Sequence, residues 1–535
     1  MQASVERLTS WRKGLPSGRR WALLPLLVLV GLPLAMLALS WFEPQPDTWQ
    51  HLRTWLLPRL VQHTLIMLVV VGLGVALLGV GLAWLSACCE YPGRRWLDPL
   101  LVMPLAFPTY VLAFIYLGLL DFAGPLQSLW REFFDGAPPL VSGLSRPAGV
   151  LYILVLAYYP YVYLLARAAF IGGGLTAFEA GRSLGVGPWG SFMRVVVPMA
   201  RPAIVAGMAL ALMETLADFG AVSIYGFETF TTAIYRTWFG LFNLTAAVQL
   251  ASILMLFVLT LLLAERFSRG HRSRLAERRP SGHRIRLRGG AALSATGIQL
   301  AVVLLGVVIP LVQLLVWVGP QFGDILARDL PALIGNTMLL GLVGAATVLL
   351  GGVLLLVSTH RAPARVMALG EIAALGYAIP GTVLAVAIML AFIRLDQTAG
   401  TALASGLLAL ILAYVIRFVR VAWGPLDGVA ERIRPEYSEV ARSLGVPRWY
   451  RLWRVNLPLL GPGLLTAFLL ALVEIAKEMP ATLMLRPFGW DTLAIRIYEL
   501  TAEGQWQAAA IPSLVLVALG AIPVFLLIRR ARVVR

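Results

Sequence analysis

The chain has 535 residues, of which 59% are hydrophobic and 13% charged, and its formal net charge is +17. An ordinary soluble domain is about 45–50% apolar and about 25% charged. The composition therefore excludes a soluble globular enzyme, and its high hydrophobicity also excludes an intrinsically disordered chain. All basic residues except Lys13 and Lys477 are arginines, and they cluster between long apolar runs. This pattern is typical of membrane topology signals rather than of a nucleic-acid-binding face, so we expect an integral membrane protein with no nucleic-acid partner.

A membrane-spanning helix needs about 20 apolar residues, and runs of that length occur about twelve times along the chain. They predict an all-α polytopic membrane protein. The approximate spans are 21–42, 61–87, 99–120, 147–168, 201–225, 243–264, 293–318, 334–358, 367–393, 402–424, 460–484 and 506–528.

The arginine clusters also predict an orientation, because basic residues are enriched in cytoplasmic loops. With the N-terminus in the cytoplasm, most arginines fall on that side, and both termini are then cytoplasmic. The first apolar run is too long for a cleavable signal peptide. We expect five segments: a cytoplasmic tail (1–20), a first repeat (21–265), a flexible arginine-rich cytoplasmic linker (266–290), a second repeat (291–529) and a cytoplasmic tail (530–535).

The two halves carry matching motifs in matching order. The segment Glu179-Ala-Gly-Arg-Ser-Leu-Gly185 recurs as Glu439-Val-Ala-Arg-Ser-Leu-Gly445, 260 residues later. Downstream matches at the same shift are Pro198 with Pro458, Pro202 with Pro462, Glu214 with Glu474 and Asp218 with Glu478. An even number of spans per half gives both copies the same orientation. We therefore expect two parallel six-helix repeats related by an axis along the membrane normal.

Each repeated segment lies on the predicted cytoplasmic side, between the fourth and fifth spans of its half. Glycine supplies the positive backbone angle that a turn between two short helices requires. The small residues Ala180, Gly181 and Ser183 would let a partner approach closely. One interpretation is an amphipathic helix resting on lipid headgroups. Repetition in both halves favours a docking surface used twice, and so a partner with two-fold symmetry.

These segments resemble the EAA loop of type I ABC-importer permeases, in which Glu-Ala-Ala is followed by three residues and then Gly. Gly181 replaces the second alanine of the first copy, and Val440 replaces the first alanine of the second. The resemblance covers essentially the whole chain as two fused permease domains, and it implies the type I ABC-importer permease fold. It assigns ATPase coupling to the following positions: Glu179, Ala180, Gly181, Gly185, Glu439, Val440, Ala441 and Gly445.

The resemblance also implies partners and location. We expect two copies of an ABC ATPase subunit, a periplasmic substrate-binding protein and membrane lipid around a multi-pass protein of the bacterial inner membrane. A nucleotide-binding P-loop needs a lysine after glycine, whereas Lys13 follows Arg12 and Lys477 follows Ala476. We therefore expect a transport subunit that is no enzyme and binds no cofactor, with ATP used by the partner.

Acidic residues occur inside the fifth and eleventh spans, as Glu214 with Asp218 and Glu474 with Glu478. An ionised side chain in mid-membrane costs about 2.5–3.5 kcal/mol on insertion scales. Residues four apart lie on one face of a helix, so each pair predicts an anionic lining of a translocation pathway, which Lys477 partly neutralises. The alternative is a structural role in which the acids bond helix to helix without touching substrate.

An oxygen-rich lining suits hard cations. The run Glu214–Gly220, followed by Thr231–Tyr235, is similar to fused permeases of ferric-iron importers. This resemblance implies ferric iron as the substrate, passed by alternating access, with no stable metal site. Permeases for thiamine, polyamines and phosphonates share the architecture and remain alternatives. Two hypotheses from other functional classes are a proton-coupled secondary transporter and a membrane scaffold.

Two further features have competing interpretations. Tyr158, Tyr159, Tyr161 and Tyr163 lie toward one end of the fourth span. Phenolate is a ferric ligand, but an aromatic belt at the membrane interface is the favoured interpretation. The adjacent Cys88 and Cys89 match no disulfide framework or zinc motif, so we expect packing residues near a helix end.

Overall fold

The computed structural model describes residues 23–134, 147–268, 283–318, 330–400 and 406–533. Within these ranges, eleven helices are long and apolar enough to cross a membrane. A twelfth apolar helix, α27 (Trp506–Val533), covers the last predicted span. The all-α polytopic prediction is confirmed, since the strands found in the described ranges are β1 (Cys89–Glu90) and β2 (Ile285–Arg286), which pair in parallel.

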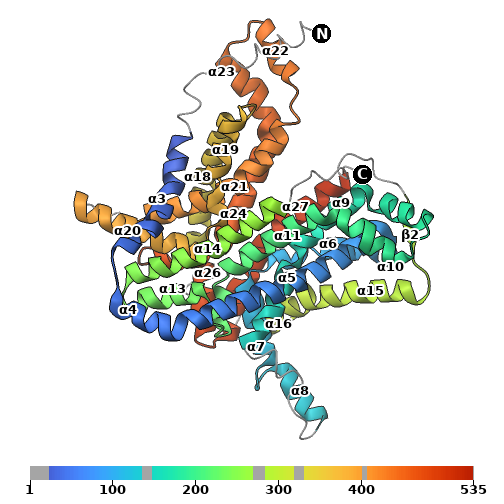
Figure 1. The fold of residues 1–535 in the computed structure, drawn as a ribbon, viewed down its shortest axis with the longest axis horizontal. Coiled ribbons are helices and arrows are strands. Elements are labelled where there is room, and N and C mark those ends of the chain that lie inside the picture. Colours follow the sequence, from blue (N-terminus) through green and yellow to red (C-terminus); the bar gives the residue numbers. More distant parts are fainter. Residues whose placement is uncertain (1–22, 135–146, 269–282, 319–329, 401–405, 534–535) are drawn as a thin grey trace. The chain divides into compact units, whose positions relative to one another are not determined.

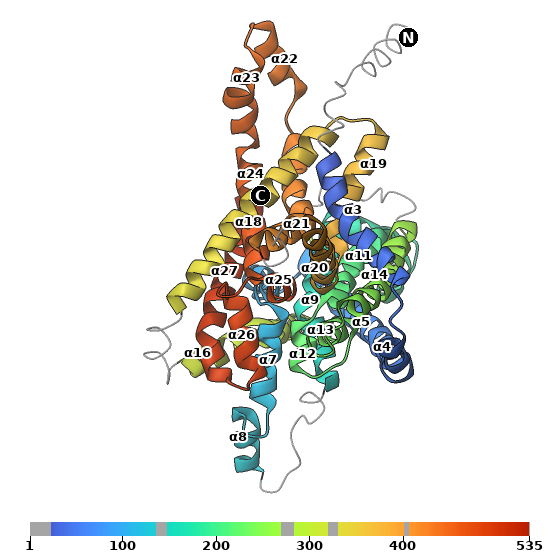
Figure 2. The same cartoon turned by 90° about the vertical axis from the view of Figure 1, so that its left-hand side faces the viewer.

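The chain folds into two compact units, whose helices are drawn in Figures 1 and 2. Unit 1 comprises the described residues within Met1–Phe42 and Gly335–Asp491, and unit 2 those within Glu43–Ile334 and Thr492–Arg535. The helices of unit 1 are α3 (Leu24–Leu39), α18 (Leu330–Thr359, most of it), α19 (Ala364–Ala373), α20 (Gly381–Ala399), α21 (Leu407–Ala430), α22 (Pro435–Ser443), α23 (Arg448–Arg451), α24 (Leu457–Lys477) and α25 (Pro480–Leu485).

Unit 2 holds the other helices, from both ends of the sequence. They are α4 (Pro46–His51), α5 (Leu57–Cys88), α6 (Arg94–Leu100), α7 (Thr109–Leu120), α8 (Pro125–Phe133), α9 (Val150–Ser183), α10 (Pro188–Ser191), α11 (Val197–Ala217), α12 (Gly220–Ile224), α13 (Phe230–Phe239), α14 (Leu244–Ser268), α15 (Gly290–Val303), α16 (Ile309–Val318), α26 (Leu493–Ala502) and α27. Short π-helical turns precede α5, α11, α16 and α24, at Leu52–Leu56, Phe192–Val196, Leu304–Val308 and Leu452–Asn456. Single 3₁₀ turns occupy Ser40–Phe42, Met103–Ala106, Pro147–Gly149 and Leu375–Ala378.

The first helix of each predicted repeat packs on helices of the other repeat. Within unit 1, α3 contacts α19, α20 and α21, and within unit 2, α15 and α16 contact α6 and α7. The contact units are therefore composed differently from the sequence repeats. Helix packing in a membrane depends on shape and small residues rather than on hydrophobicity, so the sequence pattern carries no signal for this exchange.

Glycines allow the close helix contacts inside each unit. A Cβ on Gly79 of α5 would lie 2.6 Å from the Cβ of Val162 on α9, and one on Gly207 of α11 would lie 2.7 Å from the Val162 Cα. In unit 1, a Cβ on Gly352 of α18 would lie 2.9 Å from the Cβ of Ala422 on α21. The spans thus pack through small residues, as is usual for membrane helices.

Two predicted spans begin later than expected. The spans placed at 99–120 and 367–393 start as α7 and α20, directly after Pro108 and Pro380. A residue before proline is driven out of the helical region, and Phe107 and Ile379 are accordingly extended, with ψ of 124° and 121°. Helix α8 follows α7 and points away from the rest of unit 2 (Figures 1 and 2).

The predicted linker is ordered at its C-terminal end. Residues 269–282 lie outside the described residues, but Ile285 and Arg286 form β2, in register with Cys89 and Glu90 of β1. The expectation of a linker that is flexible throughout is therefore wrong for this part.

Candidate functional site: two surface turns and two interrupted helices

The two repeated segments form the same turn. The amide of Gly185 donates to the Arg182 carbonyl oxygen at 3.0 Å, and that of Val186 donates to the Gly181 carbonyl oxygen at 3.1 Å. The equivalent bonds of Gly445 and Val446 in the second copy are 3.0 and 3.1 Å long. This is a Schellman motif, which requires a left-handed residue after the helix. Gly185 and Gly445 have φ of +83° and +72°, so the predicted positive-φ glycines are confirmed.

The surfaces of the two turns also match. Glu179, Ala180, Glu439 and Val440 are exposed. Beyond the acids, each turn exposes a leucine and a tryptophan: Leu184 (83%) and Trp189 (70%) in unit 2, and Leu444 (75%) and Trp449 (67%) in unit 1. Large exposed apolar side chains beside charged ones are typical of protein interaction sites. The two leucines were not singled out by the sequence, although their identity in both copies is a signal that could have found them.

Gly181 and Ala441 differ in exposure from the acids of the two turns. Both are buried, and a Cβ on Gly181 would lie 2.4 Å from Ser191 Oγ. That hydroxyl donates to the Phe178 carbonyl oxygen at 2.7 Å and so links α10 to α9. The expectation that Gly181 lets a partner approach is wrong, because the space beside it is filled by its own chain.

The intramembrane acids do not lie on continuous helices. Helix α11 ends at Ala217 and α24 ends at Lys477, and the next residues, Asp218 and Glu478, have extended ψ angles of 129° and 119°. The expectation that both acids of each pair lie inside one helix is therefore wrong, because the second acid is the first residue after the helix end. Pro480 opens α25 at a position favoured for proline at a helix start, and this signal of a break was missed.

Asp218 joins three elements of unit 2. Its Oδ2 accepts from Thr109 Oγ1 on α7 at 2.5 Å, and its Oδ1 accepts from the Val222 amide on α12 at 3.1 Å. The Thr231 hydroxyl on α13 donates to the Asp218 carbonyl oxygen at 2.7 Å. Asp218 is 6% exposed, so its polar atoms are directed to this junction.

Glu478 holds the equivalent junction of unit 1. Its carboxylate accepts from the amides of Ala481 and Thr482 at 2.9 and 2.8 Å, and from the Thr482 hydroxyl at 2.5 Å. The Arg417 Nη1 lies 3.5 Å from Glu478 Oε1. A Cβ on Gly381, which begins α20 as Thr109 begins α7, would lie 2.2 Å from that nitrogen. Glycine thus makes room for an arginine where the first repeat uses a threonine.

The remaining members of the pairs, Glu214 and Glu474, are half-buried on α11 and α24, as is Lys477. The Tyr158 hydroxyl donates to the Glu214 carbonyl oxygen at 3.4 Å. Three tyrosines of the predicted aromatic belt are buried instead: Tyr158, Tyr159 and Tyr163 are 9%, 0% and 1% exposed. Their hydroxyls bond within the protein, so the belt interpretation is wrong for these three.

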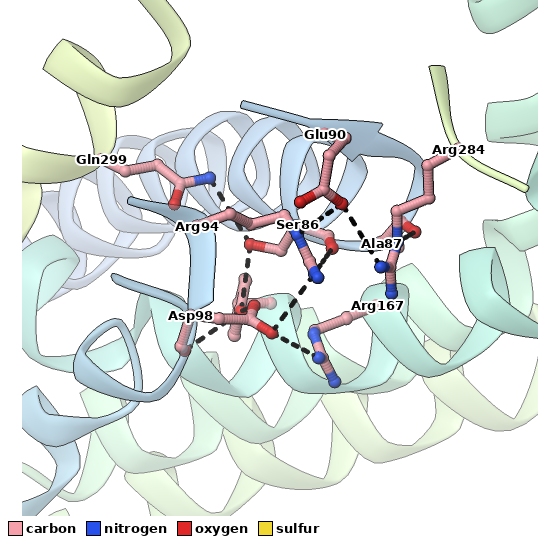
Figure 3. Close-up of polar contacts among 9 residues, drawn as sticks. Ser86, Ala87, Glu90, Arg94, Asp98, Arg167, Arg284 and Gln299 are labelled. Carbon is pink, nitrogen blue, oxygen red and sulfur yellow. Dashed lines mark hydrogen bonds and ion pairs between the residues drawn. The ribbon is translucent and has the colours of Figure 1, made fainter. Parts of the chain in front are cut away.

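A polar network lies at the end of α5 nearest the first turn (Figure 3). Arg94, 4% exposed, donates to Glu90 at 3.1 Å and to the Ser86 carbonyl oxygen at 3.2 Å. Asp98 accepts from Arg167 and from Tyr163, both at 2.6 Å. Burial also raises the pKa of Tyr91, beside this network, to about 12. Cys88 and Cys89 are 2% and 3% exposed at the same helix end, which confirms their prediction as packing residues.

A second pair of matching motifs, which the sequence analysis did not identify, follows the two helix junctions. Tyr225-Gly-Phe-Glu-Thr229 recurs as Phe488-Gly-Trp-Asp-Thr492. Gly226 and Gly489 have φ of +61° and +83°. Glu228 pairs with Arg59 at 3.1 Å and Arg236 at 3.2 Å, and Asp491 pairs with Arg486. The shared spacing of aromatic, glycine, aromatic, acid and threonine could have revealed both loops.

Within the described ranges, no group of three or more His, Cys, Asp or Glu side chains is arranged to hold a metal ion. The carboxylates described above lie at two helix junctions, in two surface turns, in the network at the end of α5 and in two further loops. The arrangement suits a conduit with exposed docking elements.

Comparison with known proteins identifies the pattern. A family model described as "binding-protein-dependent transport system inner membrane component" matches twice, at 79–266 and 348–533. The Fe(3+)-transport system permease protein FbpB 2 of Haemophilus influenzae is 27% identical over 516 residues, which is 94% of this chain and 97% of the relative. The molybdenum transport system permease protein ModB of Escherichia coli is 29% identical over 27% of this chain and 60% of its own. A putative 2-aminoethylphosphonate transport system permease protein of Salmonella typhimurium is 43% identical over 16% of this chain and 33% of its own.

Proposed function

Because the chain belongs to the family of binding-protein-dependent transport inner membrane components, we propose that it carries ferric iron across the inner membrane for an ATP-driven importer. It is a fused permease with two family domains. The observation that carries the ferric assignment is the alignment with an Fe(3+) permease over nearly the full length of both chains. The matches to permeases named for molybdenum and 2-aminoethylphosphonate cover a third or less of this chain.

The partners follow from the two surface turns. One ATPase subunit docks on Glu179–Gly185 and a second copy docks on Glu439–Gly445, with Leu184 and Leu444 filling apolar pockets of the ATPase. Two turns with the same hydrogen bonds and the same exposed side chains support a partner present twice. A periplasmic binding protein delivers substrate to the opposite face. ATP binding and hydrolysis take place in the partner, and this chain holds no cofactor.

The proposed orientation puts both termini and both turns in the cytoplasm. Its support is the arginine distribution, since Arg-rich segments flank the turns and fill the linker. In this orientation Glu228 and Asp491 belong to the face that receives the binding protein.

The acids divide into two roles in this proposal. Glu214 and Glu474, half-buried on α11 and α24, present charge to the passing cation. Asp218 and Glu478 hold the breaks that follow those helices, and their contribution to transport is positional. Hard cations prefer oxygen ligands, which is the chemical support for a ferric substrate over an oxyanion.

The test is reconstitution in proteoliposomes with the ATPase and with the binding protein loaded with ferric iron. Iron uptake that requires ATP, and that is lost in Glu179→Ala plus Glu439→Ala, is the expected result. Glu132→Ala, an exposed acid on α8, is the matched control and leaves uptake unchanged. Uptake that persists in the double variant would overturn the coupling assignment.

A proton-coupled secondary transporter is the alternative from another class, and intramembrane carboxylates are the feature that favours it. It predicts uptake driven by a proton gradient in proteoliposomes without ATPase. To identify the substrate, uptake of iron is compared with uptake of molybdate, sulfate or an aminophosphonate, each loaded on the binding protein.

A further inference from the structure

The described end of the linker lies on the first repeat rather than apart from it. Ile285 and Arg286 pair with β1, and the Leu287 amide donates to the Glu90 carbonyl oxygen at 3.0 Å. Both strands belong to unit 2. The linker segment 284–287 therefore lies against β1, at the end of α5.

Arg284 shares a carboxylate with the buried Arg94. Glu90 Oε2 accepts from Arg94 Nε at 3.1 Å and from Arg284 Nη1 at 3.4 Å, and Arg284 Nε donates to the Ala87 carbonyl oxygen at 3.3 Å (Figure 3). A buried charge is tolerated only when it is paired and hydrogen-bonded. Arg284 therefore helps to fix the carboxylate on which the nearly inaccessible Arg94 depends.

The network continues from Arg94 to the helix that carries the first turn. Arg94 Nη1 lies 4.0 Å from Asp98 Oδ2, and the same oxygen accepts from Arg167 Nη2 at 2.6 Å. Arg167 belongs to α9, which is kinked at Gly173 (φ 170°, ψ 5°), so Arg167 lies on the part before the kink and Glu179 on the part after it. Charges in such a partly buried network support one another.

An apolar route runs beside the polar one. Ile285, Leu287 and Trp84 all pack against the buried cluster of Cys89, Tyr91 and Ala295. The Trp84 ring lies 5.4 Å from the ring of Phe178, the residue before Glu179. The apolar contacts thus reach the base of the first turn, whereas the polar network reaches α9 at Arg167, before the kink.

We propose that Arg284 is a positioning residue for energy coupling. By holding the linker segment against Glu90 and the end of α5, it supports α9 on both sides of the kink. Arg94 and Asp98 connect it to Arg167 before the kink, and the linker's apolar contacts through Trp84 reach Phe178, beside the Glu179 that we propose meets the ATPase. The inference rests on the proposed function, since it gives the linker a part in ATPase coupling. The linker is then a working element of the fused chain as well as a connection between its halves.

The second repeat is supported differently. There, Arg420 of α21 pairs with Glu371 of α19 at 2.8 Å, with side chains 44% and 50% exposed. Exposed pairs contribute little, about 0–1 kcal/mol. Arg284 and Glu90 are themselves 28% and 39% exposed, so what distinguishes them is their connection to the buried Arg94, which the second pair lacks. Loss of Arg284 should therefore act on the first coupling turn and leave the second intact.

The experiment compares Arg284→Gln, Arg284→Lys and Arg288→Gln in the full complex in nanodiscs, with ferric-loaded binding protein as the probe. Arg288 is an exposed linker arginine and serves as the matched control. The readouts are the stimulation of ATP hydrolysis by the binding protein and the thermal midpoint of the permease. Arg284→Gln should lower the stimulation about fivefold or more, Arg284→Lys should restore part of it, and Arg288→Gln should match the wild type.

Each outcome has a distinct meaning. Equal stimulation in Arg284→Gln and Arg288→Gln, with a responsive wild type, would overturn the inference alone. A lowered thermal midpoint with unchanged stimulation would also overturn it, because the role of Arg284 would then be purely structural. A wild-type complex that binds no ATPase would overturn the proposed function, and the inference with it.

Discussion

The hydroxyl of Thr109, at the start of α7, donates a hydrogen bond of 2.5 Å to the carboxylate of Asp218, just past the end of α11. Because Asp218 also accepts from the start of α12, this one contact holds three helix ends together. An acid that the sequence placed in a pathway is thus part of the structural frame.

The first prediction concerns this contact. Thr109→Val removes the donor and leaves a buried carboxylate oxygen without it, which should destabilise unit 2 by about 1–3 kcal/mol. Thr109→Ser keeps the hydroxyl and should stay close to the wild type. Thermal unfolding in detergent measures both, and equal midpoints for the two variants would contradict the assigned role.

The second prediction concerns the matching position, Gly381. An added Cβ would lie 2.2 Å from Arg417 Nη1 and 2.8 Å from Glu478 Oε1, so Gly381→Ala must displace the ion pair. Overpacking of this kind costs about 1–3 kcal/mol. Gly424→Ala on α21 is the control, since nothing lies within 4 Å of its Cβ, and it should not lower the thermal midpoint. A tolerated Gly381→Ala would show that the Arg417–Glu478 pair can move freely.

The third prediction separates docking from folding. Leu184→Asp plus Leu444→Asp changes two side chains that are 83% and 75% exposed, so stability should shift by less than about 0.5 kcal/mol per site. Copurification of the ATPase should be lost, because a charge replaces an apolar anchor at each turn. Leu129→Asp, 51% exposed on α8, should retain the ATPase. If the double variant still copurifies with the ATPase as the wild type does, the two leucines are not part of the interface.

The fourth prediction concerns thiol reactivity. Burial raises the pKa of Cys89 to about 11, so the group is a protonated thiol at neutral pH and the thiolate needed for alkylation is scarce. Maleimide labelling of the folded protein should be slow at pH 7 and should accelerate as the pH rises toward that pKa. Leu184→Cys supplies an exposed thiol for comparison, and at pH 7 it should be labelled faster than Cys89. Rapid labelling of the wild type at pH 7 would show that β1 opens readily.

The sequence predicted the elements that depend on composition and spacing. Apolar runs located the spans, and the glycines of the two turns, Gly185 and Gly445, were predicted with their backbone conformation. The breaks at Asp218 and Glu478 were not predicted, because apolar residues resume directly after them and the signal of Pro480 was missed. Whether Tyr159 faces lipid or a neighbouring helix depends on packing between distant spans, and here its hydroxyl bonds to the Leu101 carbonyl oxygen. The packing of α3 on helices of the second repeat was not predicted for the same reason, since helix packing in a membrane depends on shape rather than on polarity.

The last prediction tests the pathway acids apart from the frame. Glu214→Gln plus Glu474→Gln removes two charges from half-buried positions while keeping the side-chain shape. If these carboxylates attract a passing ferric ion, uptake should fall by about tenfold or more, since a charge-assisted contact is worth about 1.5–3 kcal/mol. The thermal midpoint should change little, in contrast to Asp218→Asn, which disturbs the junction of α7, α11 and α12. Uptake measured with ferric-loaded binding protein in proteoliposomes decides the matter. An unchanged uptake rate in the double variant would show that all four acids have structural roles. The functional elements identified in this chain would then be the two surface turns, Glu179–Gly185 and Glu439–Gly445.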